Sequence, residues 1–317
     1  MPPSPPDVTV VLPVWNGARF LAESASSILG QTFTNLELLI VDDGSTDDTP
    51  QTTAGLVRSD DRVTALTVDH RGLAEALNAG LAQTRSRYVA RMDADDVALP
   101  TRIASQVAAL EADPACVAVG CAVQVVDAGA HLLGDLRFPL GHDAIVEALL
   151  TGSPGLCHSA VTYRTEAVIG VGGYRSECFP AEDLDLWARL AAVGELANLP
   201  DVLQSYRRHV GAVGVRLRES QQKKTRDIRD AERGRRGLPP LRRWQPPLSR
   251  KPEAVYHYEC GRVSLRGGRL RAARHHAREG IREAPYWTHN YAILLASALP
   301  PELLSRSWGP LGRLRRL

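Results

Sequence analysis

The sequence contains few cysteines, and none of the five is spaced as a zinc ligand or as a CxxC pair. An odd number of unpaired cysteines is typical of reduced thiols in a cytoplasmic protein. No run of residues approaches the roughly 20 apolar positions of a membrane helix. Residues 1–7 are proline-rich and lack the basic and apolar regions of a signal peptide. We therefore expect a cytoplasmic protein that meets a membrane, if at all, only peripherally, at the inner face of the plasma membrane.

Lysine is absent from residues 1–200, which carry 26 Asp and Glu against 12 Arg. Residues 201–317 carry 26 Lys and Arg against 10 Asp and Glu, so the net charge of +2 hides two regions of opposite sign. This division indicates an acidic, cation-handling body and a basic region that meets an anionic partner.

The basic region over residues 207–250 has two interpretations. One is a solvated charged helix, and the other is peripheral contact with an anionic membrane or a lipid-diphosphate acceptor. Each Lys or Arg near such a membrane contributes about 1 kcal/mol to binding. Nucleic acid is not an expected partner, because no motif for binding it accompanies the charge.

Strand and helix patterns alternate through the first 110 residues. Short β-branched or apolar runs predict buried strands, and apolar residues at helical spacing separate them. Because a β-α-β-α-β-α-β order implies a parallel sheet with helices on both faces, we expect an α/β fold. The predicted strands are 8–14, 36–41, 63–68 and 87–92, and the predicted helices are 18–29, 47–57 and 73–81.

Three regions follow from the change in composition near residue 210. We expect an α/β domain over residues 1–215 and a basic helix with a Pro-rich linker over 216–252. Residues 253–317 form a predicted α-helical extension, in which apolar residues at three- and four-residue spacing resemble a tetratricopeptide-like hairpin.

An acidic cluster, Asp93-Ala94-Asp95-Asp96, directly follows the fourth predicted strand. Ligands of parallel sheets bind beyond the carboxyl ends of the strands, and carboxylate oxygens are the ligands that Mg²⁺ and Mn²⁺ prefer. Asp93 and Asp95 can therefore face one cation. The alternative is an acidic surface turn that Arg91 and Arg102 neutralise without a metal.

A second acidic segment, Asp42-Asp43-Gly44-Ser45, lies between the second strand and the next helix. A carboxylate here can accept hydrogen bonds from the edge of a base, and the glycine allows backbone to approach a ligand closely. The alternative is that Asp and Ser only cap the following helix.

Four blocks of sequence resemble those of glycosyltransferase family 2, a bacterial-type family of inverting enzymes with the GT-A fold. The first block is Val11-Leu12-Pro13-Val14-Trp15-Asn16-Gly17, continued by Val41-Asp42-Asp43-Gly44-Ser45-Thr46-Asp47. The others are Arg71-Gly72-Leu73, Ala90-Arg91-Met92-Asp93-Ala94-Asp95-Asp96 and Ala181-Glu182-Asp183-Leu184-Asp185-Leu186-Trp187. Their order and spacing are similar to the family's across residues 8–210. The resemblance therefore implies a GT-A, Rossmann-like, mostly parallel sheet flanked by helices.

The resemblance also implies roles at the matching positions. Asp43 would read the donor's base, usually uracil, in a nucleoside pocket shaped by Pro13, Trp15 and Asn16, with Arg71 as a further nucleotide contact. Asp93 and Asp95 would contact the ribose and the metal-bound diphosphate, with Asp95 as the surer ligand of Mn²⁺ or Mg²⁺, and Asp96 would hold a metal-bound water or the sugar. Asp183 would be the general base and Glu182 would help to place the acceptor.

Two histidines are weaker candidates. His158 matches family positions near the acceptor, and His209 matches a position where relatives often have a histidine that reaches the metal or the diphosphate. In both cases the alternative is a structural histidine.

The implied function is transfer of a hexosyl or N-acetylhexosaminyl group from a nucleotide-sugar, of which a UDP-sugar is the expected example, to a saccharide or lipid-linked acceptor. Such an enzyme serves the synthesis of cell-surface polysaccharide or glycoconjugates, by a single displacement with a carboxylate base and a divalent metal. Two alternatives are a nucleotide-sugar nucleotidyltransferase and a catalytically inactive GT-A binding or scaffold protein. The first would need a glycine-rich basic loop after the first strand, and Trp15-Asn16-Gly17-Ala18 is not one.

Overall fold

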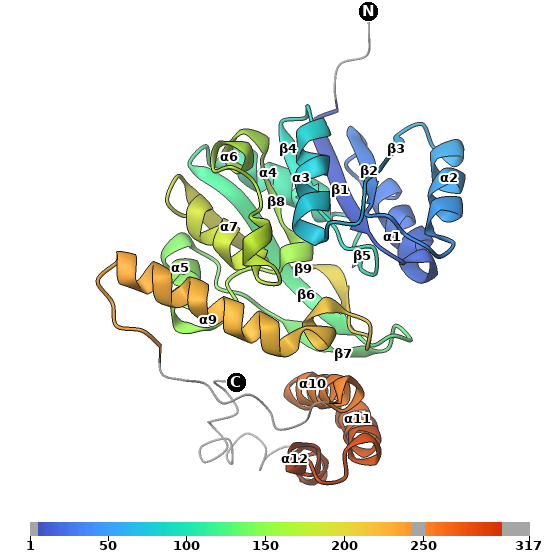
Figure 1. The fold of residues 1–317 in the computed structure, drawn as a ribbon, viewed down its shortest axis with the longest axis vertical. Coiled ribbons are helices and arrows are strands. Elements are labelled where there is room, and N and C mark those ends of the chain that lie inside the picture. Colours follow the sequence, from blue (N-terminus) through green and yellow to red (C-terminus); the bar gives the residue numbers. More distant parts are fainter. Residues whose placement is uncertain (1–5, 242–250, 300–317) are drawn as a thin grey trace, which may run out of the picture. The chain divides into compact units, whose positions relative to one another are not determined.

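The computed structural model describes residues 6–241 and 251–299. The described residues form two compact units: residues 6–123, 137–206 and 221–241 make up the first, and residues 124–136, 207–220 and 251–299 the second. Figure 1 shows the order of the elements. The strands are β1 (Val8–Val14), β2 (Leu36–Asp42), β3 (Val63–Thr67), β4 (Tyr88–Arg91), β5 (Val97–Ala98), β6 (Cys116–Val126), β7 (Leu132–Leu136), β8 (Thr162–Arg164) and β9 (Glu195–Arg207).

The first unit holds most of the helices. They are α1 (Ala18–Leu29), α2 (Thr49–Ser59), α3 (Leu73–Gln83), α4 (Arg102–Ala112), α5 (His142–Thr151), α6 (Thr165–Gly170), α7 (Glu182–Leu190) and most of α9 (Arg218–Arg235), with the 3₁₀ turns η1 (His158–Ala160) and η2 (Ser176–Cys178). The second unit holds α8 (Val213–Arg216), α10 (Pro252–Arg266), α11 (Leu270–Glu283) and α12 (Thr288–Ala296).

The parallel half of the sheet is built by the first four strands in the order β3-β2-β1-β4. Every residue of β1 is buried, as expected for a strand that helices cover on both faces. The strand and helix order predicted over residues 8–92 is confirmed, with boundaries within two residues of those predicted. Both acidic segments therefore follow strands of this parallel half, β2 and β4, which lie on either side of β1.

The sheet also contains antiparallel pairs. β8 pairs antiparallel with β4 and with β6, and β5 pairs antiparallel with β9, so the nine-stranded sheet is mixed. The predicted α/β class with flanking helices is confirmed, and the parallel pairs join β3, β2, β1 and β4. β9 is also longer than the strand predicted over residues 203–206.

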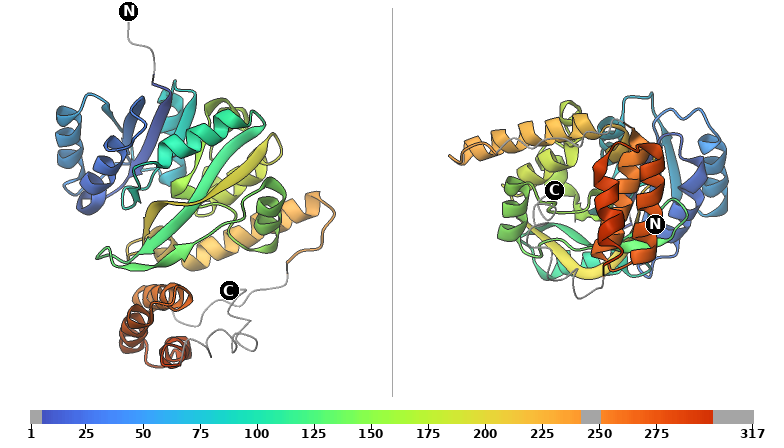
Figure 2. Two further views of the ribbon diagram at one scale, coloured as in Figure 1. Left: turned by 180° about the vertical axis from the view of Figure 1, so that it is seen from behind. Right: turned by 90° about the horizontal axis from the view of Figure 1, so that it is seen from below.

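Helices cover both faces of the sheet in the first unit. One apolar cluster unites the sheet with α3, α5, α6 and α7, and a second unites it with α1 and α4. Figure 1 shows the first set in front of the sheet, and Figure 2 shows α4 on the opposite face. This layering leaves the carboxyl edge of the parallel strands open to ligands.

In the second unit, α10, α11 and α12 share an apolar core of their own that contains Tyr258, Ala277 and Trp287. These helices occupy the region predicted as helical hairpins, whereas the predicted Pro-rich linker over 242–250 and the extension over 300–317 lie outside the described residues. The three predicted domain boundaries stay predictions. Among residues 6–241 and 251–299, no helix combines the length and the apolar character that a membrane span requires.

Candidate functional site

The candidate site is formed where the loops after β1, β2 and β4 meet. β1 lies between β2 and β4 and pairs in parallel with both. Asp43 follows β2, Asp93 to Asp96 follow β4, and Trp15 and Asn16 follow β1. Three segments that are far apart in the sequence therefore share one edge of the sheet.

Asp43 is almost fully buried, and its carboxylate organises the segment before α3. One oxygen accepts a hydrogen bond from the backbone N–H of Arg71 at 2.9 Å. The other accepts from the backbone N–H of Gly72 at 3.0 Å and contacts Nδ1 of His70 at 2.9 Å. Because a carboxylate has about four acceptor positions, one remains after these three contacts. The role of Asp43 in reading a base stays a prediction.

Trp15 and His70 form an aromatic platform beside Asp43. Their rings stack with centroids 4.4 Å apart and an angle of 16° between planes. The Trp15 side chain is 43% exposed, so the platform has apolar surface on which a flat nucleoside base can stack. The sequence interpretation found Trp15 but missed His70, whose only signal was its place directly before Arg71.

Asn16 and Pro13, which are also predicted to contact the nucleotide, have different structural roles. Asn16 has a positive φ of 52°, and its Oδ1 accepts hydrogen bonds from the backbone N–H groups of Thr46 at 2.7 Å and Asp47 at 3.3 Å. It therefore fixes the loop after Asp43. Pro13 is buried in β1 opposite Val41.

Arg71 has its side chain in solvent. This side chain is 70% exposed, and its Nη2 lies 3.6 Å from Oδ2 of Asp69. A hollow of about 330 Å³ lies beside this segment, and its lining consists of His70, Arg71, Gly72, Leu73, Ala74, Ser176 and Phe179. The hollow connects the segment that Asp43 holds with the segment that precedes Glu182.

Asp93, Asp95 and Asp96 form a compact set of oxygen ligands. One carboxylate oxygen of each lies within 4.8 Å of the others. Three like charges at this separation repel one another unless a cation compensates them, and an all-oxygen set suits Mg²⁺ or Mn²⁺. The residues present therefore fit a hard divalent cation.

The three carboxylates have different surroundings. Asp93 is partly exposed and pairs with the buried Arg91, whose Nη1 lies 2.6 Å from Oδ2 of Asp93. Asp95 is partly buried. Asp96 is almost fully buried and accepts a hydrogen bond from Nε2 of Gln204 in β9 at 2.8 Å. Arg91 thus offsets part of the negative charge of the cluster, as in the alternative of an acidic turn that arginines neutralise. Asp96 holds the turn through its buried hydrogen bond to Gln204.

A buried polar network supports this turn from behind. Arg102 donates to Oε1 of Gln204 at 2.6 Å and to the backbone carbonyl of Arg91. Gln204 also donates to Oγ of Ser159 at 2.7 Å. Arg102 therefore positions the acidic turn through Gln204, and in these contacts it does not bind a carboxylate. The sequence interpretation missed Gln204, because a glutamine in a strand gives no signal of its partners.

Glu182 and Asp183 begin α7 as a pair of shielded carboxylates. Glu182 is almost fully buried, and among residues 6–241 and 251–299 its Oε2 has no hydrogen-bond partner. Asp183 is partly buried, and its Oδ1 accepts from the backbone N–H of Leu184 at 2.8 Å. Burial raises the pKa of both carboxyls, and the charge of Asp183 raises the pKa of Glu182 further.

The pair lies within electrostatic range of the acidic cluster. The positive charge of Arg91 lowers the pKa of both carboxyls, and the negative charge of Asp93 raises the pKa of Glu182. The tertiary fold thus brings the block Ala181–Trp187 near the block Ala90–Asp96. A carboxylate with a raised pKa that still ionises is suited to accept a proton.

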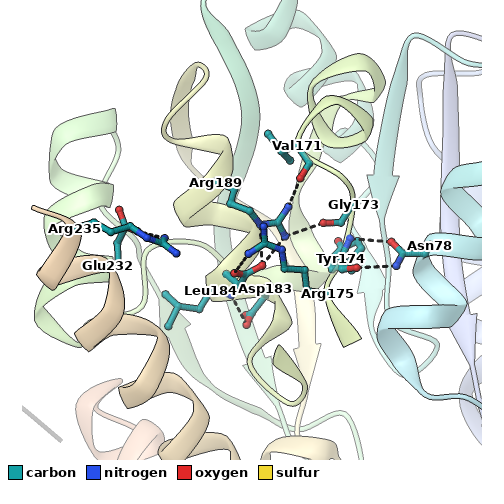
Figure 3. A network of polar contacts seen from close by, with 11 residues as sticks. Asn78, Val171, Gly173, Tyr174, Arg175, Asp183, Leu184, Arg189, Glu232 and Arg235 are labelled. Carbon is teal, nitrogen blue, oxygen red and sulfur yellow. Dashed lines mark hydrogen bonds and ion pairs between the residues drawn. The ribbon is translucent and has the colours of Figure 1, made fainter. Parts of the chain in front are cut away.

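Two polar clamps hold the segment 171–175 against α3 and α7, as Figure 3 shows. Arg189 bonds to Asp185 within α7 and donates to the backbone carbonyls of Val171 at 2.7 Å and Gly173 at 2.8 Å. Asn78 of α3 donates to the carbonyl of Tyr174 and accepts from its N–H, both at 2.8 Å. These contacts fix the segment 171–175 between α3 and α7.

His158 lies in a buried chain of hydroxyl groups. Its Nε2 is 2.9 Å from the Tyr174 hydroxyl, which is 2.7 Å from the Tyr163 hydroxyl. Its ring meets the buried Trp187 edge-on. Burial lowers the pKa of His158 well below its ordinary value, so the imidazole is neutral. Its role on the acceptor side stays a prediction.

His209 follows β9 and belongs to the second unit. Its predicted contact with a metal is not tested by the geometry of the first unit and stays a prediction.

Known proteins resemble both the sequence and the fold. The family model described as "Glycosyl transferase family 2" matches residues 9–172. A relative named "Uncharacterized glycosyltransferase" from Haemophilus influenzae is 33% identical over 217 residues, which cover 64% of this chain and 66% of that protein. The "Amylovoran biosynthesis glycosyltransferase AmsE" of Erwinia amylovora is 39% identical over 138 residues, which cover 43% of this chain and 50% of that protein. The chain thus matches between half and two thirds of the length of these relatives.

Solved structures share the fold at low sequence identity. The "Mannosyltransferase PcManGT from Pyrobaculum calidifontis in complex with GDP-Man and Mn2+" has a TM-score of 0.55 and 23% identity, and the match covers 92% of this chain and 86% of that one. "S. aureus TarS 1-349 in complex with UDP-GlcNAc" has a TM-score of 0.56 and 15% identity, and the match covers 92% and 91% of the two chains. Both are GT-A type proteins, which confirms the predicted fold.

Proposed function

Because the chain belongs to glycosyltransferase family 2, we propose that it transfers a sugar from a nucleotide-sugar donor to a hydroxyl of a saccharide or lipid-linked acceptor. One observation carries the proposal: the acidic cluster Asp93–Asp96 and the buried Asp43 lie at the carboxyl edge of one sheet, in the same unit as the shielded pair Glu182–Asp183. The bound donors of PcManGT and TarS and the name of AmsE support a nucleotide-sugar substrate and a role in polysaccharide synthesis.

The donor would lie across the loops after β1, β2 and β4. Its base, which we expect to be uracil, would stack on the platform of Trp15 and His70 and bond to the free acceptor position of Asp43. Asp95 and Asp93 would hold Mn²⁺ or Mg²⁺ against the diphosphate, with Asp96 fixing the turn. When bound, the cation supplies Lewis-acid stabilisation of the charge that develops on the leaving diphosphate.

The chemistry is a single displacement. The acceptor oxygen forms a bond to the anomeric carbon while the bond from that carbon to the diphosphate oxygen breaks. The nucleoside diphosphate leaves with the bonding electron pair, and the acceptor's proton passes to the carboxylate of Asp183. Attack opposite the leaving group inverts the anomeric carbon, and Glu182 would help to place the acceptor. The cytoplasmic location and peripheral membrane contact stay predictions from the sequence.

A panel of nucleotide-sugars tests this function by thermal shift with Mn²⁺ or with EDTA. A donor that binds only the folded state at about 100 times its Kd stabilises the protein by about 2.7 kcal/mol. We expect a UDP-sugar to raise the Tm in Mn²⁺ and to be hydrolysed or transferred. Binding without turnover for any acceptor would instead indicate a scaffold protein.

Asp95→Ala tests the cation site. We expect this variant to lose both the Mn²⁺-dependent shift in Tm and sugar transfer, because Asp95 supplies one of the three carboxylate oxygens of the cluster. Asp61→Ala, in an exposed turn before β3, is the matched control. Full activity of the natural chain in EDTA would overturn the metal assignment.

A further inference from the structure

Helix α9 is anchored beside Asp183. Near its start, Nε2 of Gln221 donates to the carbonyl of Pro180 at 3.0 Å. In its middle, Ile228 packs against the apolar cluster that contains Leu184. Figure 3 shows α9 running past the amino end of α7. The helix that the sequence offered as a solvated or membrane-facing element therefore forms a wall next to the candidate base.

Arg229 follows Ile228 on this helix. It is partly buried, and its Nε donates to the carbonyl of Leu149 at the end of α5 at 2.9 Å. The charges of Arg229 and Asp183 act on each other: Arg229 lowers the pKa of Asp183, and Asp183 raises the pKa of Arg229 against the effect of burial. The hydrogen bond to Leu149 thus holds the Arg229 guanidinium, and the charge of this guanidinium acts on Asp183.

The two terminal nitrogens of Arg229 remain available. Within the part of the chain that the structure describes, Arg229 donates through Nε and neither terminal nitrogen has a hydrogen-bond partner. A guanidinium stays charged, and its two terminal N–H groups match the two oxygens of a phosphoryl or carboxylate group. A partly buried guanidinium whose two terminal nitrogens are available is therefore a candidate binding group for an oxyanion.

Arg229 carries a positive charge in a region of the protein that is mostly negative. Residues 1–200 carry a large excess of Asp and Glu and no Lys, and the carboxylates nearest the site repel an approaching anion. A cation beside the base offsets this repulsion. An acceptor with an anionic group near its reactive hydroxyl would need one.

We infer that Arg229 is a specificity-determining residue that binds an anionic group of the acceptor, a phosphoryl or a carboxylate, next to the hydroxyl that Asp183 deprotonates. The inference rests on the proposed function. It narrows the acceptor to phosphoryl-bearing or acidic saccharides, and it gives α9 a role in recognising the acceptor.

Three probes that share a phenyl group test the inference on the full chain saturated with UDP and Mn²⁺. The probes are phenyl phosphate, phenyl β-D-glucuronide and the neutral phenyl β-D-glucoside, and isothermal titration calorimetry measures their affinities. We expect one anionic probe to bind at least about tenfold more tightly than the glucoside, which corresponds to about 1.4 kcal/mol. Which anionic probe binds more tightly distinguishes a phosphoryl from a carboxylate source.

Variants of α9 complete the test. Arg229→Gln should weaken binding of the preferred anionic probe at least about tenfold, since the charged fork is lost, and Arg229→Lys should recover part of it. Arg235→Gln, which removes an exposed arginine paired with Glu232 on the same helix, should leave the affinity unchanged. If Arg229→Gln does not fold, the affinity of Arg229→Lys for the preferred anionic probe is the test. Lysine keeps the charge but loses the pair of terminal N–H donors, so its affinity should be lower than that of the natural chain.

Two results would overturn the inference: equal affinity for neutral and anionic probes, or an anionic affinity that Arg229→Gln and Arg229→Lys both leave unchanged. A purely structural pairing of Arg229 with Asp183 would give the first result. Binding of UDP with Mn²⁺ is measured first. If no nucleoside diphosphate binds, the proposed function fails, whereas binding of a nucleoside diphosphate without any anionic binding overturns this inference alone.

Discussion

The neighbouring carboxylates Glu182 and Asp183 differ in what surrounds them. Glu182 is the more buried and has an oxygen without a hydrogen-bond partner among the residues described, whereas Asp183 accepts a backbone hydrogen bond and lies within range of Arg229. The amino end of α7 also favours the ionised form of a carboxylate. These surroundings suit Asp183 to accept a proton and Glu182 to orient a hydroxyl.

Replacing Asp183 tests this division of roles. We expect Asp183→Asn to reduce sugar transfer by about 10²–10⁴-fold, the usual contribution of a positioned base, and to leave the affinity for UDP unchanged. Steady-state kinetics and calorimetry measure the two quantities. Glu182→Gln should act mainly on the KM for the acceptor. Unchanged turnover in Asp183→Asn would remove this residue as the base.

The pH dependence of transfer reports on the same pair. The base must be ionised, and burial raises the pKa of both carboxyls above their ordinary values of 3.8 and 4.5, so activity falls with decreasing pH earlier than for an exposed aspartate. Burial and the charge of Asp183 raise the pKa of Glu182 to about 8, so Glu182 is neutral over the acidic range in which Asp183 ionises. We therefore expect the acidic limb of kcat/KM to stay in place in Glu182→Gln. A limb that moves to lower pH would show that Glu182 is charged when Asp183 titrates.

Helix α3 lies unusually close to the sheet. A Cβ atom at Gly80 would lie 2.6 Å from Cγ1 of Val11 in β1 and 3.2 Å from Cγ2 of Val41 in β2. Glycine therefore sets the distance between α3 and the sheet. The same helix carries Asn78, which holds the segment at Tyr174, so the position of α3 also affects the surroundings of α7.

A matched pair of glycines tests this contact. Gly80→Ala should lower the free energy of unfolding by about 1–3 kcal/mol through overpacking. Gly55→Ala in α2, where a Cβ would meet nothing within 4 Å, should raise it by up to about 1 kcal/mol, because alanine favours a helix over glycine. Urea denaturation measures both. Equal effects at the two positions would show that packing against β1 is not the cause.

At the scale of the whole molecule, the two units use charge differently. The first concentrates carboxylates at its ligand edge, whereas the second buries one carboxylate among arginines. Glu259 of α10 pairs with Arg262 at 2.9 Å, with Arg218 at 2.8 Å and with Arg208 at 3.3 Å. These arginines come from separate parts of the chain, so Glu259 joins residues 207–220 to α10 within the second unit.

Removal of the Glu259 charge should be costly. Glu259→Gln leaves three arginines without their shared counter-charge, and breaking a buried ion pair costs about 3–5 kcal/mol. Thermal unfolding measures the loss, and Glu253→Gln, nearer the start of the same helix and exposed, is the control. A loss no larger than that of the control would show that the cluster contributes little.

The same cluster predicts a pH dependence of stability. Its arginines hold the pKa of Glu259 at about 2 in the folded protein, below the ordinary value of 4.5, even though burial acts in the opposite direction. The stabilisation is therefore present above about pH 4.5 and is lost as the pH falls toward 2. In Glu259→Gln, the stability should change less over this range than in the natural chain.

Sequence alone determined much of this protein, because the features concerned are local. Buried strands and amphipathic helices follow from the spacing of apolar residues, and the acidic segments at Asp43 and Asp93–Asp96 follow directly from the ends of two of those strands. The four blocks also identified the family and the fold. These patterns depend on neighbours along the chain, so they can be read without knowledge of distant contacts.

Only the tertiary structure decided what surrounds those residues. The stacking of Trp15 on His70, the bond from Gln204 to Asp96 and the approach of Arg229 to Asp183 each join segments far apart in the sequence. The antiparallel pairing of β8 and the docking of α9 were decided in the same way. Their physical reason is shared: hydrogen bonds, burial and charge act through space, and the chain must fold before they bring these side chains together.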